Sequence, residues 1–211
     1  MARDPEAPPA RLYLITPPLA AAQPFDAALK AALGAGDVAC VLVRFATPDP
    51  GARKTIVRAL TPFVQDFGAA LLLAADPQLA ARAGADGAHV TGVGETLDQA
   101  IESLKPDRIV GVGGLDSRDA CMAAGELDVD YLMFGGLDDS MSPAAVLERT
   151  QWWAEIFNVP CVAFAQSLTE VDALSNAGAE FIALDAAVWD DARGPAAAVE
   201  EAGARCAGAL A

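Results

Sequence analysis

The stretch AGADGAHV, residues 83–90, combines the end of a helix with the start of a strand. Glycine often ends helices in the left-handed conformation, and the apolar residues after Asp86 are typical of a buried strand. Similar stretches occur at residues 35–38 (AGDV) and 177–180 (AGAE), with a looser version at 125–130 (GELDVD). The recurrence indicates a chain assembled from repeated helix-to-strand connections.

Short apolar runs alternate with longer Ala-rich stretches of helical periodicity along the chain. Apolar runs without polar alternation are typical of strands buried on both faces of a parallel sheet. We expect strands at residues 11–16, 39–45, 69–74, 87–90, 108–112, 131–135, 161–164 and 181–184. Helices are expected to begin near Phe25, Gly51, Pro77, Thr96, Ser117, Ala144, Leu168 and Gly194.

Eight strand–helix units joined by short connections predict an α/β fold, a single (β/α)8 TIM barrel. A doubly wound sheet is the alternative, but Thr16-Pro17-Pro18 follows the first strand where such folds usually carry a Gly-rich phosphate loop. We expect a flexible, Pro-rich N-terminus at residues 1–10 and a single barrel domain at residues 11–211.

Composition excludes several classes of protein. The 29 acidic against 14 basic residues leave a net charge of −15, which argues against a nucleic-acid partner. The N-terminus lacks the apolar segment of a signal peptide, and no apolar run is long enough to span a membrane. The four cysteines are scattered through apolar stretches, which favours buried thiols and a cytoplasmic protein. Trp152 and Trp153 leave a homo-oligomer open.

The single histidine, His89, excludes a metal site built from several histidines. It lies inside the apolar run of the fourth predicted strand, so we expect a hydrogen-bonded core histidine more than a catalytic one.

An ordered set of motifs resembles the thiamine phosphate synthase and TenI-like family. The motifs span most of the chain and are LYLIT (12–16), VLVR (41–44), AGADGAHV (83–90), IVGVGG (109–114), VDYLMFGG (129–136), PCVAF (160–164) and GAEFIAL (178–184). The resemblance implies a transferase of thiamine biosynthesis that joins hydroxymethylpyrimidine pyrophosphate to thiazole phosphate and releases pyrophosphate. It also implies Mg²⁺, held by acidic residues, and a small phosphorylated pyrimidine or thiazole ligand.

The family's motifs are only partly present on the first half of the predicted rim, where strands end. Arg44 matches the arginine of the family's Gln-x-Arg-x-Lys, while Leu42 and Ala46 replace its partners. Ala74 and Ala75 replace Asn-Asp, and HVTGVG (89–94) stands where the family has His-Leu-Gly-Gln-x-Asp. The resemblance therefore identifies neither of the family's metal-binding acids in this chain.

The second half of the rim departs in the same way. Gly113 replaces a serine and Leu115 the histidine used by TenI-like proteins, while residues 140–143 (SMSP) replace Thr-x-Thr-Lys. Ala165-Gln166 replaces a Gly-Gly phosphate loop, and Asp185 replaces a phosphate-binding serine. Losing one charge-stabilising donor typically slows an enzyme about 10²–10³-fold, so we expect catalysis to be impaired.

The candidate ligand-binding residues lie on the predicted rim, where the family's motif is either kept or replaced. They are Arg44, Gly113, Gly135, Gly136, Ser140, Gln166 and Asp185. Arg44 is equally expected to bind an anion or to pair with Asp76 or Asp185. Weak metal candidates are Asp76, Glu95, Asp138 and Asp139, although Asp76 before Pro77 is also a good helix cap. The alternatives to an impaired synthase are a non-catalytic binding or interaction protein and a diverged barrel with a new ligand or metal at its acidic rim.

Overall fold

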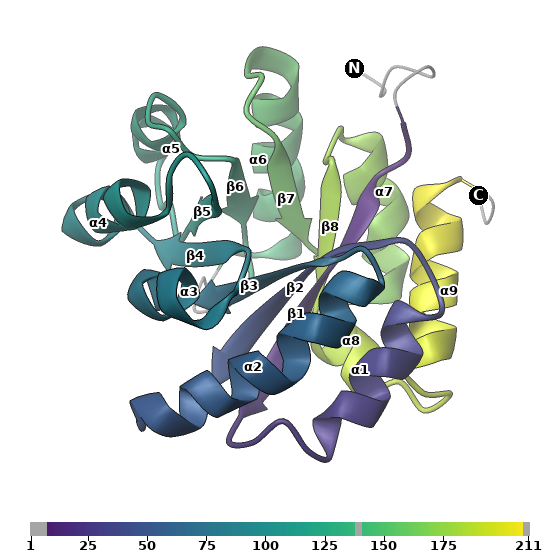
Figure 1. Cartoon of the computed structure of the whole chain (residues 1–211). Coiled ribbons are helices and arrows are strands. Elements are labelled where there is room, and N and C mark those ends of the chain that lie inside the picture. The colour runs from purple at the N-terminus through teal and green to yellow at the C-terminus, as the bar shows by residue number, and fades with distance from the viewer. Residues whose placement is uncertain (1–7, 138–140, 209–211) are drawn as a thin grey trace.

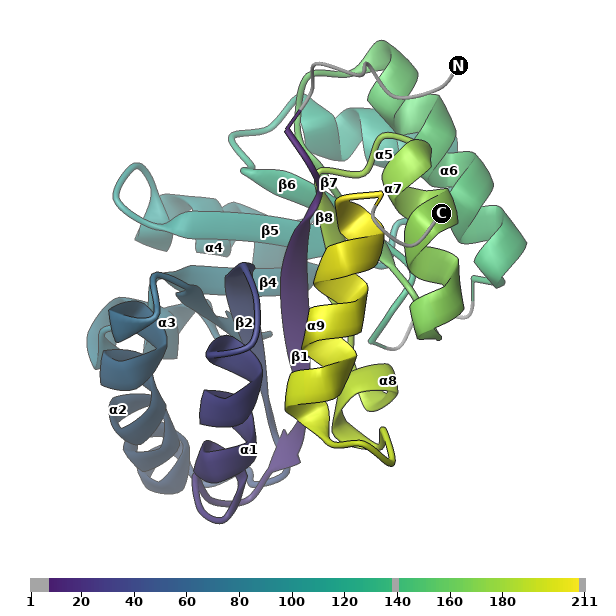
Figure 2. The ribbon, with the colours of Figure 1, turned by 90° about the vertical axis from the view of Figure 1, so that its right-hand side faces the viewer.

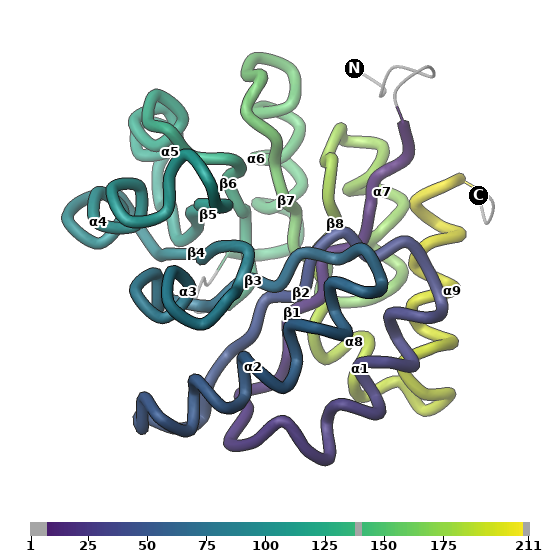
Figure 3. The backbone as a smooth tube through the Cα atoms, in the orientation of Figure 1, coloured from purple at the N-terminus to yellow at the C-terminus, as the bar shows by residue number. Residues whose placement is uncertain are grey.

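The computed structural model describes residues 8–137 and 141–208. Eight parallel strands follow one another around a closed barrel, and β1 pairs with β8 to complete it (Figures 1 and 3). The predicted (β/α)8 class is confirmed. The strands are β1 (Arg11–Leu19), β2 (Val38–Phe45), β3 (Ala70–Ala74), β4 (Gly87–Thr91), β5 (Ile109–Gly113), β6 (Tyr131–Phe134), β7 (Cys161–Phe164) and β8 (Phe181–Leu184).

The helices surround the barrel on its outer face (Figure 1). They are α1 (Phe25–Leu33), α2 (Pro50–Asp66), α3 (Pro77–Ala83), α4 (Glu95–Leu104), α5 (Arg118–Gly125), α6 (Pro143–Ile156), α7 (Val171–Asn176), α8 (Ala186–Trp189) and α9 (Pro195–Cys206), with a 3-10 turn at Leu168–Glu170. Asp76 and Ser142 cap α3 and α6 ahead of the prolines that start them, and the sequence predicts this for Asp76.

Helix α4 begins at Glu95, one residue before the expected start. Its N-cap is Gly94, whose φ of 120° suits glycine, and no side chain caps it. The short helix α8 has only four residues, which is too short a stretch to show helical periodicity in the sequence.

Both faces of the strands are buried, which explains their continuous apolar sequence. Outward-facing residues such as Leu12 and Leu14 pack with the helices, whereas Tyr13 and Ile15 point into a second cluster that fills the barrel. Helices α1 and α9 lie side by side over the region where β1 and β8 close the barrel (Figure 2). Even Ala10, just before β1, is buried in the outer cluster.

Carboxylates join neighbouring strands at the amino-terminal mouth of the barrel, the end where the strands begin. Asp86 precedes β4 and accepts a hydrogen bond from Leu71 N of β3 at 2.7 Å. Two more acids make the same kind of contact between later strands. Asp130 accepts from Val110 N of β5, and Glu180 accepts from Cys161 N of β7. These three acids are the ones seen in the repeated helix-to-strand stretches of the sequence.

In the fourth copy of the repeat, the donor to the carboxylate is a side chain and not a backbone N–H group. Asp37, which precedes β2, accepts two hydrogen bonds from the guanidinium of Arg11 on β1, at 2.7 and 2.9 Å. We call these four contacts, made by Asp37, Asp86, Asp130 and Glu180, the carboxylate clasps. Each joins an even-numbered strand to the odd-numbered strand before it.

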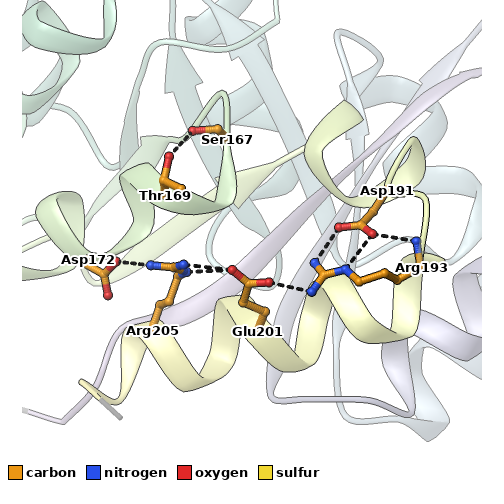
Figure 4. Close-up of polar contacts among 7 residues, drawn as sticks. All are labelled: Ser167, Thr169, Asp172, Asp191, Arg193, Glu201 and Arg205. Carbon is orange, nitrogen blue, oxygen red and sulfur yellow. Dashed lines mark hydrogen bonds and ion pairs between the residues drawn. The ribbon is translucent and has the colours of Figure 1, made fainter. Parts of the chain in front are cut away.

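A chain of ion pairs holds the last helix against its neighbours. Arg193 contacts Asp191 and Glu201, and Arg205 contacts Glu201 and Asp172 (Figure 4). The figure shows these side chains running along α9 from the loop after α8 to α7. These contacts join α9 to the loop after α8 and to α7.

Trp152 and Trp153 pack in the cluster between the strands and the surrounding helices. Trp153 is buried and donates to Val159 O at 2.7 Å, while Trp152 lies against Phe157 and the guanidinium of Arg118. The four cysteines, all within the described residues, are buried and form no disulfide. Across the described chain, the helices are too short or too polar to cross a bilayer.

A candidate ligand site at the carboxyl-terminal mouth

An open pocket of about 420 Å³ lies at the carboxyl-terminal mouth, where the strands of the first half of the barrel end. Arg44, Arg53 and His89 provide its nitrogen-bearing side chains, and Phe45, Ala74 and Leu137 form much of its apolar wall. Ligands bind at this end of TIM barrels because the loops that follow the strands converge there.

Arg44 is the last-but-one residue of β2 and lies half-buried in this pocket. Its Nε donates to Thr16 O at 2.7 Å, and its backbone N donates to the buried Thr16 hydroxyl at 3.1 Å. No carboxylate among the described residues lies within ion-pair distance of Arg44, so neither Asp76 nor Asp185 is its partner. The two terminal nitrogens of the guanidinium make no hydrogen bond to the described part of the chain.

Arg53 is a second pocket cation, which the sequence analysis missed. It lies in the first turn of α2, where Nε donates to Thr47 O at 2.7 Å and Nη1 pairs with Asp76 at 3.2 Å. Its guanidinium also lies 5.3 Å from the centre of the Phe45 ring. The prediction considered only residues next to strand ends, whereas a helix that follows a strand also brings its first turn to the mouth.

Both carboxylate oxygens of Asp76 make structural contacts. One carboxylate oxygen caps α3 by accepting from Leu79 N at 3.1 Å, and the other accepts from Arg53. Glu95 is exposed at the start of α4 and accepts from the side chain of Gln99. Within the described residues there is no cluster of three acidic, histidine or cysteine side chains that could hold a metal. The described residues thus show no site for the Mg²⁺ that the family resemblance implies, and Asp138 and Asp139 lie outside them.

The candidate glycines have conformational and packing reasons to be glycine. Gly135 and Gly136 have φ values of 75° and 79°, which disfavour other residues, and a Cβ at either would press on Phe164. A Cβ on Gly113 would come within 2.9 Å of His89 Nε2. Gly113 thus keeps one edge of the imidazole clear.

Two more candidates, Gln166 and Asp185, are not among the residues that line this pocket. Gln166 is exposed, and its backbone N donates to Glu170 at 2.9 Å, within its own loop. Asp185 caps α8 through a hydrogen bond from Ala186 N. Asp138, Asp139 and Ser140 lie outside the described residues. The roles of all these residues in binding stay predictions.

His89 is buried with 2% exposure, as expected, yet it also lines the pocket. Its Nδ1 is hydrogen-bonded to the hydroxyl of Tyr131 at 3.0 Å, and its ring stacks on the Tyr131 ring. Burial lowers the pKa of His89 to about 4, so the imidazole is neutral near neutral pH.

Together, the fold and the pocket define a TIM barrel with an arginine-lined pocket at its carboxyl-terminal mouth. Residues 12–188 match the model of the family described as thiamine monophosphate synthase (TMP-TENI). The chain belongs to this family.

Two curated relatives cover nearly the full chain. A thiamine-phosphate synthase of Rhodospirillum centenum is 42% identical over 90% of this chain and 95% of its own length. One from Hyphomonas neptunium is 34% identical over 91% of each. Among solved structures, the thiamine phosphate pyrophosphorylase from Pyrococcus furiosus superposes with a TM-score of 0.80, covering 95% of this chain and 97% of that one. At 21% identity, this last likeness supports the fold alone.

Proposed function

We propose that this chain is a thiamine-phosphate synthase-type protein that binds a phosphorylated pyrimidine or thiazole compound at the carboxyl-terminal mouth, with slowed condensation. The observation that carries the proposal is the pair of arginines in one pocket, of which Arg44 has no carboxylate partner in the described chain. A guanidinium binds phosphate oxygens through paired N–H donors, which suits a mono- or diphosphate group.

The two arginines have different parts in this binding. Arg44 is oriented by Thr16 through Nε alone, which leaves its terminal N–H groups to the ligand. Arg53 is shared with Asp76, so it adds positive charge at the pocket while its carboxylate partner offsets part of that charge. We therefore expect Arg44 to contribute more to anion affinity than Arg53.

The groups around the pocket support the proposed slowing. In the family reaction, as the resemblance implies it, acidic residues hold Mg²⁺ at the departing pyrophosphate. Ala74 and Ala75 line the pocket where the family has Asn-Asp, and Asp76 caps a helix. Without those carboxylates the charge that develops on the leaving group is stabilised less, which lowers turnover by about 10²–10³-fold per lost group.

Binding is tested by thermal unfolding of the full-length protein with and without inorganic pyrophosphate. A ligand that binds the native state raises Tm, and a variant that cannot bind loses that rise. We expect Arg44→Ala to remove most of the rise and Arg53→Ala to remove part of it. Arg58→Ala, an exposed arginine on the same helix as Arg53, is the matched control and should keep the full rise.

Turnover is tested separately by following pyrophosphate release from the two substrates with Mg²⁺. Binding with release far slower than that of the Rhodospirillum relative, assayed in parallel, supports the proposal. Release at a comparable rate would overturn the proposed slowing, and the absence of any pyrophosphate-dependent rise in Tm would overturn the binding site. Binding of pyrophosphate with no release at all would favour a non-catalytic binding protein.

A further inference from the structure

Three buried polar side chains form a hydrogen-bonded row inside the barrel. The Tyr13 hydroxyl of β1 lies 2.8 Å from the Tyr131 hydroxyl of β6, which lies 3.0 Å from Nδ1 of His89 on β4. All three side chains are at most 5% exposed. Gly111 makes room for the row, because a Cβ there would overlap the Tyr131 ring. The row includes both tyrosines and the only histidine of the chain.

The hydroxyl protons of this row have a favoured direction. Burial raises the pKa of Tyr13 and Tyr131 well above the usual value, so each keeps a proton to donate. A neutral imidazole nitrogen is more basic than a phenol oxygen and is therefore the better acceptor. Tyr131 then donates to Nδ1 and accepts from Tyr13. The ring nitrogen that receives this bond carries no proton, so the proton of the neutral imidazole is on Nε2.

Because Nδ1 of His89 is hydrogen-bonded to Tyr131, Nε2 is the ring nitrogen left to face the pocket that His89 lines. Gly113 lies beside Nε2, and His89 itself lines the pocket that contains Arg44. No described residue forms a hydrogen bond with Nε2. A donor at the inner end of the pocket is thus left to a ligand.

We infer that Tyr131 and Tyr13 are positioning residues that hold His89 as the neutral Nε2–H tautomer, so that the pocket presents one uncharged donor. The group it recognises is an uncharged acceptor atom, such as the ring nitrogen of a heterocycle whose phosphate is bound by the arginines. The nature of that ligand rests on the proposed function, whereas the tautomer does not.

The test uses the fact that the chain has a single histidine. Protein labelled with ¹⁵N-histidine gives one pair of ring-nitrogen signals, and long-range proton–nitrogen correlations distinguish the two tautomers. We expect Nε2 to be the protonated nitrogen in the wild type near neutral pH. A protonated Nδ1, or an even mixture of tautomers, would overturn the inference without the need for any variant.

Variants then test the role of the hydroxyls. Tyr131→Phe keeps the ring that stacks on His89 and removes only the donor, and we expect it to give a mixture of tautomers. Tyr13→Phe leaves the Tyr131–His89 hydrogen bond in place, and we expect a smaller shift toward the mixture. An unchanged single tautomer in Tyr131→Phe would contradict the positioning role.

Pyrophosphate binding separates this inference from the proposed function. Because the arginines bind the anion, Tyr131→Phe should keep the pyrophosphate-induced rise in Tm. If the wild type shows the Nε2–H tautomer but no such rise, the proposed function fails and the positioning role stands. If the rise is present and the tautomer is wrong, only the positioning role fails.

Discussion

His89 makes the stability of the protein depend on pH in a defined window. Burial lowers its pKa from 6.5 to about 4 in the folded chain. As pH falls from 6.5 toward 4, the unfolded chain takes up a proton that the native imidazole does not bind. The free energy of unfolding therefore decreases through this window and is independent of His89 above it. At about pH 5 the loss amounts to about 2 kcal/mol.

Denaturant unfolding of the wild type and of His89→Gln, near neutral pH and at mildly acidic pH, measures this effect. The carboxylates titrate in both proteins, so the difference between their pH dependences isolates the histidine. The variant should lose less stability on acidification than the wild type. Equal losses in the two proteins would mean that the native imidazole is protonated as readily as an exposed one.

Individual side chains were predictable where their partners are local in sequence. Asp76 was predicted as a helix cap from the adjacent Pro77, and it is one. The partner of Arg44 depends on long-range geometry, and the structure pairs Asp76 with Arg53 instead. The link from His89 to Tyr131 crosses from β4 to β6, and no local pattern in the sequence indicates it.

The carboxylate clasps add side-chain hydrogen bonds to the backbone pairing at the amino-terminal mouth. Asp86 accepts hydrogen bonds from Leu71 N and from the side chain of Gln65, so removing it leaves an amide of β3 without its acceptor. We expect Asp86→Ala to lower the free energy of unfolding by about 1–3 kcal/mol, the usual cost of losing a charged hydrogen-bond partner.

The measurement is equilibrium urea unfolding, with Asp66→Ala as the control. Asp66 is exposed at the end of α2, and its replacement should change stability by less than about 0.5 kcal/mol. If Asp86→Ala is as mild as the control, the clasp at β3–β4 is not a stabilising contact.

The elements themselves were largely readable from the sequence. The expected strands at residues 161–164 and 181–184 coincide with β7 and β8, because short apolar runs bounded by polar turns mark buried strands clearly. β1 extends to Leu19, past the expected end at Thr16, since Pro18 and Leu19 continue the pairing with β2 after an irregular step in register. The acidic residues of the repeat were also visible in the sequence. Their role as hydrogen-bond acceptors was not, because the N–H groups that donate to them belong to the neighbouring strand.

The net charge of −15 acts on the protein as a unit. Like charges distributed over a compact surface repel one another and destabilise the folded state. Raising NaCl from about 10 mM to about 150 mM shortens the screening distance from about 30 Å to about 8 Å. We expect Tm to rise over this range, although screening also weakens ion pairs such as those along α9.

Thermal scans across the salt series test this expectation, with a non-ionic osmolyte series at matched osmolality as the control for solvent exclusion. A Tm that falls with salt would mean that the attractive ion pairs outweigh the general repulsion. The sign of the slope therefore reports which electrostatic contribution dominates in this acidic barrel.

The carboxylate clasps and the pocket lie at opposite ends of the barrel. The four clasps lie where the strands begin, and the pocket lies where the strands end. A side chain at the carboxyl-terminal mouth can therefore be exchanged without removing any of these four contacts at the other end of the barrel.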